Sequence, residues 1–121
     1  MVVTTYGKAQ AALRLGSNIQ TIGWVAVGSG SGAVGTGNIN LVAEIDRNAF
    51  TSDGIDYSSA RKIAFASRFT SVEMSGTQLR EFGAFSTGTA NTGSLWNREG
   101  FAAVNFDGTN ELEVEISYEV Y

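Results

Sequence analysis

The most regular feature of the sequence is an alternation of apolar and polar residues at its C-terminal end. Over residues 111–121 every second side chain is apolar, and most of the intervening positions are glutamate. The apolar positions are Leu112, Val114, Ile116, Tyr118 and Val120, and the glutamates are Glu111, Glu113, Glu115 and Glu119. A period of two is typical of a β-strand with one buried face. The pattern therefore predicts a half-buried strand whose glutamates face away from the core.

Two other segments carry apolar side chains at adjacent positions. These are residues 19–27, where Trp24 is followed by Val25, and residues 79–85. Neighbouring side chains of a strand point to opposite faces, so both segments are predicted to be strands covered on each side. A 121-residue monomer has little material to cover both faces, and the pattern therefore favours contact with another subunit.

A long strand is predicted from residue 63 onward. Ile63 and Phe69 share one face of it, whereas Val72 and Met74 lie on the other face. The apolar phase therefore changes near Thr70, and a β-bulge or a bend is the usual cause of such a change.

Helix and turn signals complete the expected order of elements. Residues 6–15 predict a short helix, capped by Thr4 or Thr5, and residues 41–45 predict a short helical turn. Loops and turns are predicted at residues 50–59, 75–77, 87–94, 98–100 and 107–110, the last as a hairpin, and a further strand is predicted at 101–106. We expect a single domain over residues 1–121 that is all-β, an antiparallel β-sandwich or small barrel with one short N-terminal helix.

Composition narrows the possible functions. The chain has no Cys and no His, so it has no disulfide framework, no thiolate metal site and no histidine base. A net charge of −4 and the absence of a Lys/Arg run argue against nucleic-acid binding and against a basic membrane patch. We also expect no signal peptide, because the N-terminus lacks a charged start before an apolar core, and no membrane insertion.

A glycine-rich loop over residues 28–37 is the most prominent candidate for chemistry. Gly30, Gly32 and Gly35 have the G-x-G-x-x-G spacing of dinucleotide-binding turns. Such a turn needs a helix that opens on its last glycine, and residues 36–38 intervene here. We therefore expect a tight connection that turns sharply and lets the backbone approach another subunit closely.

The carboxylates and hydroxyls give no clear catalytic arrangement. Asp53 and Asp56 are close in sequence, as are Asp107 and Glu111, but their positions in turns favour hydrogen bonds to backbone amides. The spacing at residues 53–56 does not match that of a calcium-binding loop. The glutamates near the C-terminus are expected to lie on a solvated sheet face or to meet basic groups of a partner. A serine nucleophile would need a lysine base, and no motif supports one.

Three aromatic residues, Trp24, Tyr57 and Trp96, are candidates for a sugar-binding platform, because aromatic faces stack on sugar rings. Core packing is the expected role of Trp24. For Trp96, which lies between polar loops, a place at the core edge and a place on a contact surface are both open.

The motifs of the chain, taken in order, resemble a family of viral proteins. They are Leu15-Gly16-Ser17, Gly23-Trp24-Val25-Ala26-Val27-Gly28-Ser29-Gly30, Asn40-Leu41-Val42-Ala43-Glu44-Ile45-Asp46-Arg47, Leu79-Arg80-Glu81-Phe82-Gly83-Ala84-Phe85 and Leu95-Trp96-Asn97-Arg98-Glu99-Gly100-Phe101. Over residues 6–121 this order resembles the tail structural proteins of tailed bacteriophages and related archaeal viruses, which include tail-fibre, baseplate and tail-tip components. The chain departs from the family pattern at Ala84, where a larger apolar residue is usual, and in a glycine loop richer in Ser and Gly.

The resemblance implies a non-enzymatic, β-rich protein of the virion that forms a homo-oligomer, most often a trimer, and contacts neighbouring virion proteins. It implies no catalytic residue, cofactor or metal. The residues we expect at the subunit interface are Trp24, Gly28, Gly30, Gly32, Gly35, Phe82, Phe85, Trp96 and Arg98. Two alternatives stay open: a capsid decoration protein, and a carbohydrate- or receptor-binding module that meets a host surface glycan through Trp96 and residues 87–94.

Overall fold

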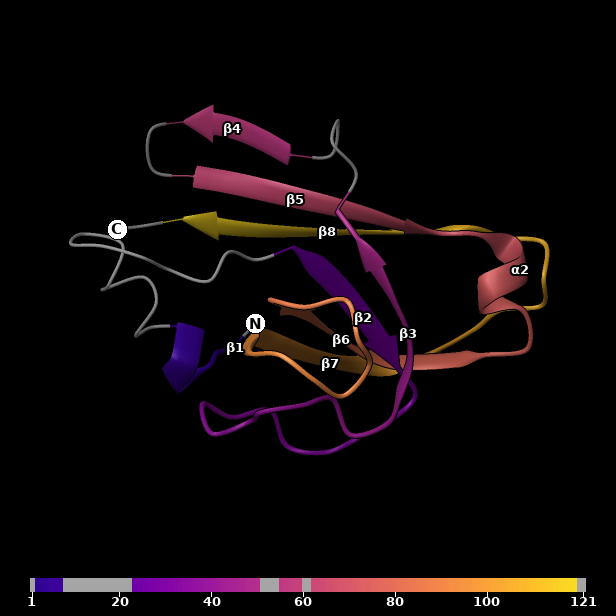
Figure 1. The fold of residues 1–121 in the computed structure, drawn as a ribbon. Helices are drawn as coiled ribbons and strands as arrows, with labels where there is room; N and C mark the ends of the chain where they lie inside the picture. The colour runs from indigo at the N-terminus through magenta and orange to yellow at the C-terminus, as the bar shows by residue number, and fades with distance from the viewer. Residues whose placement is uncertain (1, 8–22, 51–54, 60–61, 120–121) are drawn as a thin grey trace.

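A computed structural model describes residues 2–7, 23–50, 55–59 and 62–119, which fold into two antiparallel β-sheets (Figure 1). The larger sheet has the strand order β1-β7-β6-β2-β3, and the smaller sheet has the order β4-β5-β8. The elements are β1 (Val2–Val3), β2 (Trp24–Gly28), β3 (Glu44–Ala49), β4 (Ile55–Ser59), β5 (Lys62–Phe69), α2 (Ser71–Met74), β6 (Gln78–Phe85), β7 (Leu95–Asn105) and β8 (Leu112–Glu119). The all-β, antiparallel fold class predicted from the sequence is confirmed.

Strand β8 has the alternation that the sequence predicts. It pairs with β5 in an unbroken antiparallel register. Val114 and Ile116 are buried in the core, whereas Glu113 and Glu115 are exposed. Because β8 lies at the edge of its sheet, these glutamates oppose unwanted pairing with another sheet edge.

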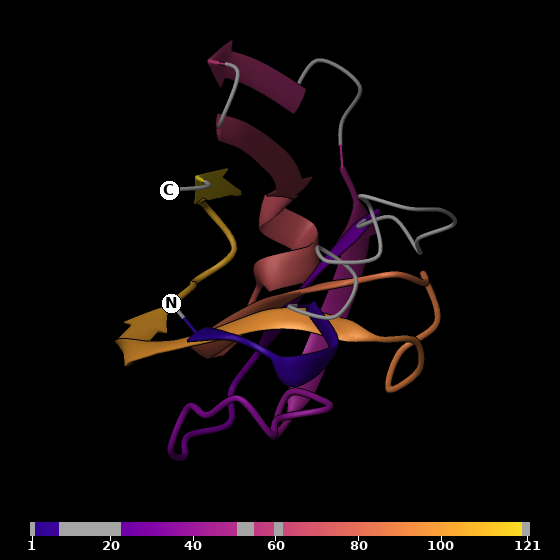
Figure 2. The same ribbon diagram turned by 90° about the vertical axis from the view of Figure 1, so that its left-hand side faces the viewer.

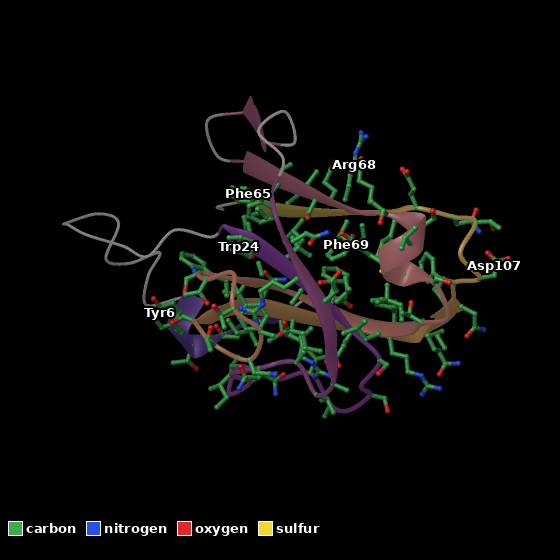
Figure 3. All side chains as sticks on the ribbon, turned by 45° about the vertical axis from the view of Figure 1, so that its right-hand side comes forward. Tyr6, Trp24, Phe65, Arg68, Phe69 and Asp107 are labelled. Atoms are coloured by element: carbon green, nitrogen blue, oxygen red, sulfur yellow. The ribbon has the colours of Figure 1, made fainter. Side chains whose placement is uncertain are left out.

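The main core lies between the two sheets. Phe69 of β5 points into it and is fully buried, whereas the neighbouring Arg68 points outward (Figure 3). Val25 and Val27 of β2 enter the same cluster from the larger sheet, and Met74 of α2 closes one end of it. Burial of these apolar side chains is the main favourable contribution to folding.

The outer face of the larger sheet, which is the face turned away from the smaller sheet, is covered by the chain itself. Ala26, Phe85 and Leu95 form a second apolar cluster there with Leu41, which comes from the loop between β2 and β3. Figures 1 and 2 show this loop, residues 29–43, on the far side of the larger sheet from the smaller one. The second apolar faces of β2 and β6, for which the sequence favoured cover by another subunit, are thus covered inside the chain.

The side chains of β6 change faces of the sheet at a β-bulge in its pairing with β7. The pairing of β6 with β7 shifts between Leu79 and Glu81: one residue, Arg80, lies between them on β6, opposite residues 101–103 of β7, so the extra residues belong to β7. Leu79 and Phe82 therefore both contact the main core, whereas Glu81 and Phe85 lie on the outer face. A regular strand would have placed Leu79 and Phe82 on opposite faces.

The short helix predicted at residues 41–45 is wrong. The chain instead enters β3 at Glu44, and this strand pairs with β2 at the edge of the larger sheet. The helical spacing of Leu41, Val42 and Ile45 suggested a buried stripe, but only Leu41 is buried. Pairing with β2 therefore outweighs a weak local preference for helix.

Two more predictions need correction. Residues 55–59, predicted as a loop, form β4 and pair with β5. The phase change at Thr70 marks a helix rather than a bulge, because Thr70 and Glu73 form a reciprocal capping box at the start of α2. The T-x-x-E spacing of that box is visible in the sequence. The predicted turn at 75–77 and loop at 87–94 are confirmed.

Strand β7 runs straight through residues 98–100, where the sequence predicted a turn, because these residues pair with β6. The turn at residues 107–110 connects β7 to β8 in the other sheet, so it is not a hairpin. The carboxylate of Asp107 accepts hydrogen bonds from the hydroxyl (2.6 Å) and backbone amide (3.0 Å) of Thr109. These bonds lower the pKa of Asp107.

The predicted N-terminal helix falls only partly on the described residues. Residues 5–7 are helical, and the amide of Gly7 donates to the Thr4 hydroxyl (3.0 Å), which confirms Thr4 as a cap. Residues 8–15, and residues 19–22 of the predicted strand, lie outside the described residues. Within the described ranges, no helix has the length and apolar character needed to cross a membrane.

The phenol of Tyr118 gives a pH prediction. Burial raises the pKa of Tyr118, and its hydroxyl donates to Asn97 Oδ1 in the main core. The folded pKa therefore lies above the unfolded value of about 10. The contribution of this difference to stability is fully present below about pH 10 and is lost as the pH rises further. Above about pH 10 the unfolding free energy of Tyr118→Phe should therefore fall less steeply with pH than that of the wild type, by up to about 1.4 kcal/mol per pH unit.

Urea unfolding at a series of alkaline pH values measures this slope. Tyr6→Phe is the matched control, since Tyr6 lies at the rim of the same core. An equal change in slope for both variants would contradict the assignment to Tyr118.

Candidate functional site

The outer face of the larger sheet carries two cross-strand rows of charged and small residues. In the register of β7, β6, β2 and β3, one row is Arg98, Gly83, Ala26 and Arg47, and the next is Gly100, Glu81, Gly28 and Glu44. Each row thus has charged groups separated by glycine or alanine. The small residues leave room above the sheet for the loop of residues 29–43.

Glu81 is the centre of this arrangement. Its side chain is 0% exposed, and its two oxygens accept four hydrogen bonds. Oε1 accepts from Arg98 Nε (3.0 Å) and from the amide of Val42 (2.8 Å), and Oε2 accepts from the amides of Gly30 (2.8 Å) and Ala43 (2.9 Å). A carboxylate offers about four acceptor positions, so Glu81 uses all of its capacity to hold the loop at both ends.

Arg98 extends the same network to the middle of the loop. Its guanidinium is buried beside Glu81, and Nη1 donates to the carbonyl of Ala33 (3.2 Å) and to Asn38 Oδ1 (3.4 Å). Asn38 Oδ1 also accepts from the amide of Gly35 (2.9 Å). This ion pair therefore holds the loop at several points, together with backbone bonds from Ser29 to Ala43 and from Thr5 to Thr36.

Two glycines allow the backbone to approach the buried carboxylate. A Cβ on Gly28 would lie 2.5 Å from the carbonyl oxygen of Ala43 and 2.8 Å from Glu81 Oε2. A Cβ on Gly30 would overlap Glu81 Oε2 and Val42 Cβ and would lie 2.7 Å from the amide nitrogen of Ala43. The close approach expected of this loop is thus made to the chain's own glutamate.

A second ion pair lies at the other end of the rows. Arg47 is buried and forms a bidentate pair with Glu44, with N–O distances of 2.6 and 3.0 Å. Its Nη1 donates to the carbonyls of Thr87 (3.0 Å) and Thr92 (2.9 Å), and its guanidinium lies 3.7 Å from the centre of the Phe85 ring. This pair holds the loop of residues 86–94 as Arg98 and Glu81 hold the loop of residues 29–43.

The predicted interface residues fall into three places. The first place is around Glu81, where Gly28, Gly30, Gly35 and Arg98 lie, and Gly32 is exposed on the same loop. The second is beside Arg47, whose guanidinium lies over the ring of Phe85. Phe82 and Trp96 face the main core, where the Trp96 ring packs edge-on against Tyr6. Trp24 packs against the outer cluster, close to Gly88. Their role at a subunit interface stays a prediction.

Sequence reasoning missed the two glutamates and Arg47 as members of this site. A signal for Glu81 was present: a charged residue stands in the middle of an otherwise apolar strand, and a buried carboxylate requires partners. The sequence gives no comparable indication that Glu44 and Arg47 are buried, because a short polar segment is as typical of a solvated loop as of a strand. Their burial follows from the loop of residues 86–94 folding over them.

The arrangement offers structure rather than reactivity. The oxygens of Glu81 are occupied by a cation and three amides, which leaves no lone pair to accept a proton from a substrate. The chain after Gly35 turns and continues to β3, so no helix opens on the glycine loop. Among the described residues no group of three or more Asp, Glu, His or Cys side chains is placed to hold a metal ion.

The remaining candidates do not come together either. Trp96 is buried, Trp24 lies on the opposite face of the larger sheet, and the side chain of Tyr57 lies outside the described part of the chain, so no aromatic platform is formed by the described residues. On the exposed face of β8, Glu113 pairs with Arg68 at 3.0 Å. The candidate Asp53, together with the side chain of Asp56, falls in the undescribed part.

Alanine substitutions in the glycine loop test whether Glu81 fixes its backbone. Gly30→Ala should lower the free energy of unfolding by about 1–3 kcal/mol, because the new methyl group overlaps a buried carboxylate and a backbone amide. Gly32→Ala is the matched control: its Cβ would lie 3.7 Å from Val42 Cγ2, an ordinary contact, and we expect a change within about 0.5 kcal/mol. Chemical denaturation measures both, and equal effects would refute the close approach at Gly30.

Removal of the buried cation tests the ion pair. Arg98→Met leaves Glu81 buried without its counter-charge and should cost about 3–5 kcal/mol of unfolding free energy. Arg68→Met, which breaks an exposed pair with Glu113, should cost at most about 1 kcal/mol. If Arg98→Met does not fold, Arg98→Lys gives an intermediate loss that can be measured. A loss no greater than that of Arg68→Met would contradict the role of Arg98.

Comparisons with known proteins were made at three levels. A scan against protein-family models, a search of curated proteins and a search of solved structures found no match for this chain. Function is therefore argued from the residues and the geometry described above.

Proposed function

We propose that this chain is a non-enzymatic structural protein of a tailed virus, a tail, fibre or baseplate component that assembles with copies of itself and with neighbouring virion proteins. The sequence resemblance motivates the proposal, and a β-sandwich with tightly held loops is compatible with it. A trimer is the expected oligomer. Because the outer face of β2 and β6 is covered inside the chain, subunit contacts must come from other surfaces.

One observation carries the assembly part of the proposal: exposed apolar side chains gather at the open edge of the larger sheet. Ile39, Val42 and Ile45 are 75%, 60% and 37% exposed, and they lie within seven consecutive residues that lead into the edge strand β3. Edge strands offer unpaired backbone groups, and exposed apolar side chains beside them favour association. We call this surface the β3 edge.

The β3 edge is presented on a fixed backbone. The amides of Val42 and Ala43 are bound by Glu81, and Glu44 at the start of β3 is paired with Arg47. A surface that is already ordered loses little conformational freedom when a partner binds, which favours repeated contacts between identical subunits. The buried ion pairs would then serve assembly by shaping the surface that a neighbouring copy meets.

A place on the capsid as a decoration protein is compatible with the same features. Copy number separates the two locations, since hundreds of copies per particle favour decoration. The carbohydrate-binding alternative was motivated by Trp96, and this residue is buried against Tyr6 and the main core.

Charge substitution at the β3 edge tests self-assembly. The wild-type chain should sediment as an oligomer at micromolar concentration, and Val42→Asp should shift it toward the monomer. Val72→Asp is the matched control, because Val72 is 83% exposed on α2, away from a sheet edge. A wild-type chain that sediments as a monomer, or an equal effect of both variants, would contradict assembly through the β3 edge.

The virion assignment needs a separate measurement. Antibody labelling of intact particles in the electron microscope should place the chain on the tail or its baseplate. A monomeric chain that is also absent from purified particles would overturn the proposed function.

A further inference from the structure

A hollow of about 190 Å³ lies between the glycine loop and the middle of β7. Residues 30–32 of the loop line it, and so do Arg80 and Arg98. A water molecule takes about 30 Å³ in the liquid, so the hollow has room for a group of several heavy atoms. The Glu81 carboxylate, which is paired with Arg98, is already neutralised and saturated with hydrogen bonds.

Arg98 has one nitrogen that the network leaves unpaired. Nε and Nη1 donate to Glu81, Ala33 and Asn38, whereas Nη2 is buried without a hydrogen-bond partner in the described part of the chain. The Arg98 side chain is only 1% exposed. Buried donors are nearly always satisfied, and an unpaired donor on a charged group is among the least favourable cases. Because Arg98 lines the hollow, an acceptor bound there is the candidate partner of this nitrogen.

Arg80 supplies the second positive charge. It lies on β6 opposite the bulge of β7, it is half-buried and lines the hollow, and its Nε donates to Gln78 Oε1 (3.2 Å). A guanidinium has five N–H donors, and with the described residues the Arg80 side chain makes only this bond, which leaves donors for an anion. Ser31 and Gly32 also line the hollow, and their amides make no hydrogen bond with the described residues.

We propose that this hollow is a binding site for a small oxyanion, a phosphate- or carboxylate-type group whose oxygen accepts from Arg98 Nη2 and whose charge is shared by Arg80. Two guanidinium groups beside exposed backbone amides are the donors that such anions prefer. The oxyanion can be a free ion or the carboxylate of a second copy of this acidic chain, which exposes Glu111 and Glu115. The proposal does not depend on the virion assignment.

Titration of the full chain with inorganic phosphate, and separately with acetate, tests the site by nuclear magnetic resonance. Chloride holds the ionic strength constant. Phosphate or acetate should cause saturable shifts of the Arg98 Nε–H signal and of the amides of Ser31 and Gly32. Arg80→Gln should weaken binding about threefold to tenfold, as expected for the loss of one charge-assisted contact. Arg68→Gln, on the exposed face of the smaller sheet, should leave it unchanged.

Sedimentation distinguishes the second source of the oxyanion. If a carboxylate of another copy fills the hollow, self-association should weaken in Arg80→Gln and in Glu115→Gln, and phosphate should compete with it. Circular dichroism shows that each variant is folded. The proposal is overturned if neither anion gives a saturable shift and self-association does not depend on Arg80, or if Arg68→Gln reduces binding as much as Arg80→Gln does.

Discussion

The burial of one carboxylate is the constraint on which the outer half of this fold depends. Glu81 lies on a sheet face beneath a loop, where an ionised group is stable only if its charge is balanced and its oxygens are bonded. Arg98 and the amides of Gly30, Val42 and Ala43 meet that requirement. The loop of residues 29–43 has no regular secondary structure, so its course depends strongly on the hydrogen bonds to this carboxylate.

The same physical solution occurs twice on this face. Arg47 with Glu44 holds the loop of residues 86–94 through two backbone carbonyls, just as Glu81 holds its loop through backbone amides. Buried ion pairs are often no more stable than apolar groups of the same size. Here they hold loops in position, because apolar contacts are not directional and could not fix an irregular backbone as hydrogen bonds do. A protein that works through the shape of its surface gains from loops held in this way, and this supports the proposed structural role.

The sequence was informative where a pattern repeated over several residues. The alternation at Leu112, Val114 and Ile116 was enough to predict β8 and its buried face, because a period of two has one simple solution. It failed where two or three residues carried the evidence: Val42 and Ile45 suggested a helix, yet both are exposed on or before a strand. Residues 98–100 suggested a turn, yet they pair with β6 in the middle of β7, since a neighbouring strand outweighs a local turn preference.

The sequence by itself therefore determined the fold class, the main strands and the outward row of glutamates, because these depend on side-chain periodicity along one segment. It also marked the glycine loop and Arg98 as important. Only the tertiary structure decided what they contact. The partner of Gly28 and Gly30 is a glutamate about fifty residues away, as the bond from Gly30 to Glu81 spans 51 positions. Such a partner is set by the register of three strands and by the bulge of β7 opposite Arg80, and neither leaves a periodic trace in the sequence.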